Sequence, residues 1–114
     1  MSDRILSLFG KTLKSAPIDF ALTGDQTIIA AVPGRRIKVY AIMLNTVLAL
    51  TVRFKSGGNN LTGAIALGVN SVVNIATAAP SFLLATNIGE AFVMNLGTAI
   101  QASGFVSYWD DDSF

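Results

Sequence analysis

The sequence predicts an all-β protein, an antiparallel jelly-roll-like β-sandwich with a short N-terminal amphipathic arm. Short segments alternate apolar and polar residues at a period of two, which is typical of strands with one face in a core. Turn-forming Gly, Asn and Pro separate these segments at intervals of about 8–12 residues, as in sandwich proteins. The pattern gives about eight or nine short strands, which is typical of an antiparallel sandwich.

The length of 114 residues allows one domain with a single modest core. We assign residues 1–17 to the arm and residues 18–114 to the sandwich. The arm is the one stretch with a helical pattern, because large apolar residues share one side of a helical wheel over residues 3–15. These residues are Ile5, Leu6, Leu8, Phe9 and Leu13.

We expect this helix to end before Pro17, which pushes its preceding residue out of the α region. A helix of about a dozen residues is marginal alone in water and needs a surface to lie on. That surface is its own domain, a partner protein or a membrane. We take the five apolar residues as candidate partner-binding residues.

Strand-like sequence follows the arm in residues 18–23 and 26–32, separated by a turn at Gly24 and Asp25. The next two strands, residues 36–40 and 51–55, alternate basic and apolar residues. We expect them to form a hairpin that turns at Asn45 and Thr46, with apolar residues facing inward on both strands. Val39 then lies opposite Val52, and Ile37 opposite Phe54.

This hairpin places four basic side chains in one patch on its outer face. They are Arg36, Lys38, Arg53 and Lys55. Like charges opposite one another destabilise a sheet, so we expect an anionic neighbour and take all four as candidate partner-binding residues. The alternatives are a solvated face of splayed side chains, or pairing with the acidic residues 110–112 of the same or an adjacent subunit. Nucleic acid is the least favoured partner.

The remaining strands are expected in residues 61–67, 70–77, 82–86, 90–96 and 100–109, and residues 56–60 form a glycine-rich loop. A three-residue loop at residues 97–99 predicts that the last two strands form a hairpin. In that hairpin Phe92 lies opposite Gly104, and Met94 lies opposite Ala102, which pairs large residues with small ones.

Composition argues against an enzyme, a cofactor and a metal site. The chain has no His and no Cys, which removes the commonest general base and the thiolate ligands. Asp19, Asp25 and Glu90 fall at turns or strand ends, where carboxylates are ordinarily solvated or capping groups. The three adjacent carboxylates at 110–112 lack the alternate spacing that surrounds a cation.

Charge and hydropathy indicate protein partners. The net charge of +1 argues against direct nucleic-acid binding, and the longest uncharged apolar run, residues 39–52, is shorter than the roughly 20 residues of a membrane helix. Charged residues make up 13% of the chain, against about 25% in typical domains, and none lies between Lys55 and Glu90. We therefore expect apolar surface to face another chain, and a homo-oligomer, most simply a homotrimer.

The segments PGRRIKV, VRFKSG, LTGAIAL, PSFLLAT, NIGEAF and QASGFVSYW resemble, in content and order, small β-sandwich virion proteins of tailed bacteriophages. The resemblance spans residues 30–109 and does not include the arm. It implies a non-enzymatic capsid cement or decoration subunit that binds the major capsid protein, often as a trimer. A tail-fibre or receptor-binding module is the alternative, which the short loops disfavour. The expected location is the capsid surface of a virion made in the host bacterial cytoplasm.

Overall fold

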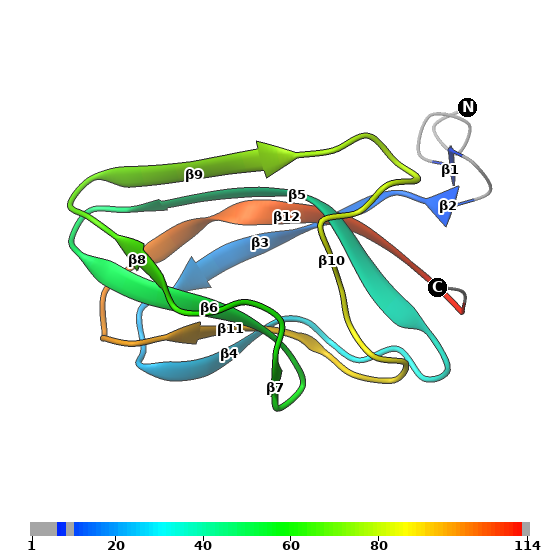
Figure 1. Ribbon diagram of the computed structural model, residues 1–114, viewed down its shortest axis with the longest axis horizontal. Helices are drawn as coiled ribbons and strands as arrows, with labels where there is room; N and C mark the ends of the chain where they lie inside the picture. Colours follow the sequence, from blue (N-terminus) through cyan, green and yellow to red (C-terminus); the bar gives the residue numbers. More distant parts are fainter. Residues whose placement is uncertain (1–6, 9–10, 113–114) are drawn as a thin grey trace.

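The structure, a computed structural model, describes residues 7–8 and 11–112, and every element in this part of the chain is a β-strand (Figure 1). The first sheet contains β3 (Lys14–Phe20), β5 (Arg36–Thr46), β9 (Ser71–Ala76), β10 (Leu84–Ala85) and β12 (Ala102–Asp111). The second contains β4 (Gly24–Ile29), β6 (Leu50–Ser56), β7 (Asn59–Asn60), β8 (Ile65–Leu67) and β11 (Phe92–Leu96). A short pair, β1 (Ser7–Leu8) and β2 (Lys11–Thr12), forms a separate two-stranded sheet.

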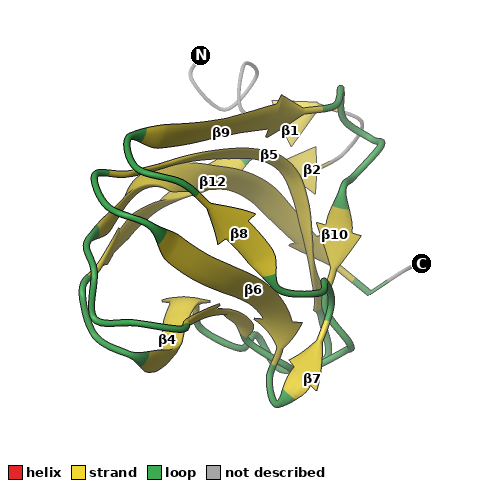
Figure 2. Ribbon diagram, turned by 60° about the vertical axis from the view of Figure 1, so that its left-hand side comes forward, coloured by secondary structure: helices red, strands yellow, loops and turns green. Residues whose placement is uncertain are grey.

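The two sheets pack face to face, which confirms the predicted antiparallel sandwich (Figure 2). The first sheet has the order β10-β5-β12-β3, with β9 also beside β5. The second has the order β4-β11-β6-β7, with β8 also beside β6. Consecutive long strands therefore alternate between the two sheets along much of the chain.

This alternation overturns the hairpin predicted for residues 36–55. β5 and β6 belong to different sheets, and residues 47–49 carry the chain from one sheet to the other. Val39 lies opposite Leu84 and Tyr108, not opposite Val52. Val39 and Val52 are nevertheless both in the core, because each strand keeps its apolar alternation toward the space between the sheets.

The hairpin predicted for the last two strands is wrong for the same reason. β11 pairs with β4 and β6, whereas β12 pairs with β3 and β5. Gly104 lies between Ile18 and Leu44 rather than opposite Phe92. An added Cβ at Gly104 would lie 1.9 Å from the carbonyl oxygen of Met43, so this glycine permits close approach of β12 and β5.

The helix predicted for residues 3–15 is wrong where the structure describes it. Residues 11–12 and 14–20 are strands, and Pro17 lies inside β3, where it pairs with Phe105. β3 is an edge strand, and an edge strand tolerates a residue without a backbone donor. β3 also crosses the boundary expected after residue 17. Of the five apolar arm residues, Ile5, Leu6 and Phe9 lie outside the described residues, Leu8 is in β1, and Leu13 is half-buried before β3.

A bulge in β5 decides which side chains of this strand face the core. Across from β12, the register steps from Ala41 to Val39 and leaves Tyr40 without a directly opposite residue. Ile42 and Leu44 face inward on one side of this bulge, and Ile37 and Val39 on the other. The extra residue thus keeps both halves of an 11-residue strand in the core, with Lys38 on the outer face.

Candidate functional site

The four basic residues predicted to share one patch lie in two sheets. Arg36 and Lys38 are on β5, while Arg53 and Lys55 are on β6. The two strands direct their polar side chains to opposite outer faces of the sandwich because both direct their apolar residues inward. The single patch is therefore wrong, and partner binding by these residues stays a prediction.

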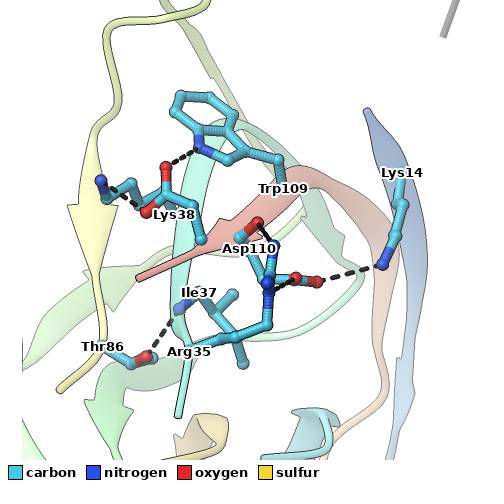
Figure 3. Close-up of polar contacts among 8 residues, drawn as sticks. Lys14, Arg35, Ile37, Lys38, Thr86, Trp109 and Asp110 are labelled. Atoms are coloured by element: carbon cyan, nitrogen blue, oxygen red, sulfur yellow. Dashed lines mark hydrogen bonds and ion pairs between the residues drawn. The ribbon is translucent and has the colours of Figure 1, made fainter. Parts of the chain in front are cut away.

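Lys38 forms a buried ion pair with Asp111 of β12 (Figure 3). Its Nζ lies 2.9 Å from Asp111 Oδ1, and the two side chains are only 3% and 7% exposed. The other oxygen, Oδ2, accepts a hydrogen bond of 3.0 Å from Trp109 Nε1. Pairing of a basic residue with the acidic residues 110–112 of its own chain, one of the alternatives from the sequence, is thus what the structure shows for Lys38.

Phe82 covers this buried pair from the segment between β9 and β10. Its ring meets Trp109 edge to face at 6.3 Å between centroids, and Lys38 Nζ lies 5.3 Å from its centroid. Backbone hydrogen bonds fix both ends of the segment to β5, from Thr77 N to Tyr40 O and from Leu83 N to Val39 O. The cluster is enclosed by its own chain and joins β5, β12 and this segment, so we assign it a structural role.

Asp110 makes a second ion-pair group at the same end of the sandwich. Lys14 Nζ lies 3.0 Å from Asp110 Oδ2, and Arg35 Nε donates a hydrogen bond to Oδ1 (Figure 3). Burial raises the pKa of Asp110, but the hydrogen bonds from Lys14 and Arg35 outweigh it and hold the pKa below the ordinary value. The group ties β3 and the loop before β5 to β12.

A third ion pair lies on the outer face of the second sheet. Lys55 Nζ is 2.9 Å from Asp25 Oδ2, and Asn95 Nδ2 donates a 2.7 Å hydrogen bond to Asp25 Oδ1. The hydrogen bonds from Asn95 and Lys55 lower the pKa of Asp25. The outward positions of this sheet therefore carry charge, including Arg53 beside Asn95 in the register.

The part of the outer face of the first sheet that lies beyond the β5 bulge from Lys38 and Asp111 is different, and we call it the uncharged face. It consists of the outward residues of β9, of β3 apart from Asp19, and of β5 and β12 on that side of the bulge, as set by the register and the inward core residues. Its members are Ser15, Pro17, Ala41, Met43, Asn45, Val72, Asn74, Ala76, Ser103, Phe105 and Ser107. Val72 is 67% exposed and Phe105 is 41% exposed. Asp19, which accepts a hydrogen bond from Gln101, lies at its margin.

Sequence reasoning missed this face because four strands from distant parts of the chain build it. The run without charge between Lys55 and Glu90 supplies only β9 of the four. A signal was present in β12, where Ser103, Phe105 and Ser107 alternate with inward residues and place an aromatic ring among small hydroxyls on the outside. A charged face would place Lys or Glu at such positions.

The described residues hold no group of three His, Cys, Asp or Glu arranged to bind a metal ion. In the same part of the chain no helix is long and apolar enough to cross a membrane. Glu90, expected as an ordinary turn carboxylate, accepts hydrogen bonds from Ser56 Oγ at 2.6 Å and Asn87 Nδ2 at 3.1 Å, which lower its pKa. These bonds hold the turn before β11 against the end of β6.

The sequence matches no protein-family profile and no curated protein. Among solved structures it is similar to a chain from the Bacillus endospore appendages, described as a novel family of disulfide-linked pili. The identity is 21%, the match covers 88% of each chain, and the TM-score is 0.39. A likeness at this level does not identify a function, and the resemblance to phage virion proteins stays a prediction.

Proposed function

We propose that the chain is a non-enzymatic structural protein of a phage virion, a capsid cement or decoration subunit. It binds the major capsid protein and other copies of itself, with a homotrimer as the expected oligomer. The observation that carries the proposal is the uncharged face, a broad sheet surface that exposes Val72 and Phe105 and holds its one carboxylate, Asp19, at the margin.

The broad side of the molecule that holds this face is large enough for a protein interface. The molecule measures 40 × 28 × 18 Å, so a broad side spans at most about 1,100 Å² in projection. A stable interface buries about 800 Å² on each partner. Interface centres are depleted in charge and accept aromatic and Met side chains, as Phe105 and Met43 would supply. Covering the face with protein therefore removes apolar area from water without burying an unpaired charge.

The arrangement of charge agrees with this assignment. Lys38 and Asp111 neutralise one another inside the chain, and Asp110 is held by Lys14 and Arg35. Pairing within the chain uses these charges to hold the sandwich together. Attachment through a neutral surface should consequently depend little on salt, because screening acts on exposed charges.

The test places one charge on each outer face. Phe105→Lys adds a cation to the centre of the uncharged face, and Thr51→Lys adds one to an exposed outward position of β6 as the control. We expect both to fold, and Phe105→Lys to weaken co-sedimentation with undecorated phage heads at least about tenfold, because a charge would be buried at the interface. Equal binding by the two variants, or no binding by the parent chain, would reject the proposal.

A further inference from the structure

The end of the sandwich opposite the ion pairs of Asp110 and Asp111 gathers four loops that are distant in sequence (Figure 1, left end). They connect β3 to β4, β5 to β6, β8 to β9, and β11 to β12. Their residues are 21–23, 47–49, 68–70 and 97–101. These loops contain no Asp, Glu, Lys or Arg. We call this end the apolar tip.

The apolar tip carries the most exposed large aliphatic side chains of the described residues. Leu22, Val47, Leu48 and Val69 are 56–68% exposed, and Val72 of the uncharged face, 67% exposed, lies two residues beyond the β8–β9 loop. Every other exposed large hydrophobic residue in the described chain is less exposed than these. A patch of several such side chains without charge among them marks an interaction site.

Short loops and hydrogen bonds fix the shape of this tip. Three of the four loops have only three residues, too few to fold back over their own side chains. Asn70 N donates to Val47 O at 3.2 Å and so joins two of the loops, and Thr46 Oγ1 donates to Leu48 O at 2.6 Å. A surface held in this way loses little conformational freedom when it binds.

We infer that the apolar tip packs against the apolar tip of a second copy of this chain, related by a two-fold axis; this contact is additional to those within the proposed homotrimer and would join two such assemblies. Two identical surfaces that meet in this way bring like residues together, which is unfavourable for charged groups and harmless for aliphatic ones. The two shorter extents of the molecule are 28 and 18 Å, so its end spans at most about 500 Å² in projection per copy. The upper bound of about 1,000 Å² for two copies reaches the size at which specific protein contacts begin.

A lipid surface fits the tip less well. Protein surfaces that enter a membrane interface typically carry Trp or Tyr together with Lys or Arg. The four loops contain neither an aromatic nor a basic residue. Lipid binding is therefore an outcome of the test that would contradict the inference. Self-association is measured with the purified chain alone, so its result is separate from binding to phage heads.

The test replaces Leu22, Val47, Leu48 and Val69 together by Ser. The control is Ile88→Ser, an exposed residue in the loop between β10 and β11, at the other end. In sedimentation equilibrium, the tip variant should halve the mass of the assembly, or weaken its dissociation constant at least about tenfold, while the control keeps the mass of the parent chain. An unchanged mass for the tip variant overturns the inference.

Single charged substitutions at Leu48 test the inference even if the variant with four Ser substitutions does not fold. Leu48→Lys and Leu48→Glu should each dissociate alone and should associate again when mixed, because opposite charges then meet near the two-fold axis. No recovery on mixing overturns the two-fold contact. Sedimentation of the parent chain with phosphatidylcholine vesicles, lost in the Leu48→Glu variant without a change of mass, would assign the tip to lipid instead.

Discussion

The buried pair of Lys38 and Asp111 gives the sharpest test of how this fold is held together. Lys38→Met nearly keeps the length of the side chain and removes its charge, so Asp111 loses its buried ion pair with Lys38 while Trp109 Nε1 still donates to Oδ2. Removing one partner of a buried pair costs about 3–5 kcal/mol. In a chain of 114 residues this corresponds to a fall in Tm of about 12–20 °C.

A matched variant separates the effect of burial from that of the ion pair itself. Lys55 and Asp25 lie at the same 2.9 Å, but Asp25 is about half exposed, so Lys55→Met should cost less than about 1 kcal/mol. The double variant Lys38→Met with Asp111→Asn should be more stable than Lys38→Met alone, because it also removes the buried negative charge while the amide oxygen still accepts from Trp109. Urea unfolding measures the free energies of unfolding of the parent chain, the two single variants and the double variant. Equal costs for Lys38→Met and Lys55→Met would refute the reasoning.

Three further predictions concern other parts of the fold. Gly104→Ala should destabilise the protein by about 3 kcal/mol or more in urea unfolding, while Ala at Gly63, which has open space, should not. Asp110→Asn should cost about 1 kcal/mol at neutral pH. Folding lowers the pKa of Asp110, so this stabilisation is complete above the ordinary value of 3.8 and disappears as pH falls through the folded value. The free energies of unfolding of the parent chain and of Asp110→Asn, measured in urea at several pH values, should therefore converge as the pH falls. Deleting residues 1–12 spares β3 and should leave the β-rich circular dichroism spectrum intact, whereas deleting residues 1–16 removes three residues paired with β12 and should lower Tm.

The positions of most strands could be predicted from the sequence because they depend on local alternation. The segment at residues 70–77 became β9, and that at 90–96 became β11, each within two residues of the expected bounds. Inward residues such as Val39 and Val52 were also predictable, since a strand that keeps one face in the core obeys the same period in either sheet. The class of fold follows from these two facts.

Strand partners were not predictable by the same reasoning. A short connection favours a hairpin, but residues 47–49 and 97–101 each join strands in different sheets. Alternation specifies which face of a strand is buried and leaves open which edge it pairs with. The predicted patch of four cations was wrong although the basic residues of both strands were correctly placed on the outer side. The error was the pairing of these two strands, which lie in different sheets.

The error at the N-terminus has a different cause. Apolar residues in the arm follow each other closely, so a helical wheel gathers them as readily as a strand does. Pairing with β12 over Lys14–Phe20 supplies backbone hydrogen bonds that the isolated segment lacks. Tertiary pairing of this kind overrides a weak local preference, particularly where Gly10 already weakens a helix.

The two loops that were wrongly predicted to be hairpin turns both belong to the apolar tip. Residues 47–49 and 97–101 cross between sheets at the same end of the sandwich, as do residues 21–23, so the crossings themselves bring these loops together. Had β5 and β6 formed a hairpin within one sheet, Val47 and Leu48 would lie in a single turn at its edge. The sheet-switching topology instead places them with Leu22 and Val69 on one surface. The candidate contact is thus a property of the topology, and no single segment of the sequence contains it.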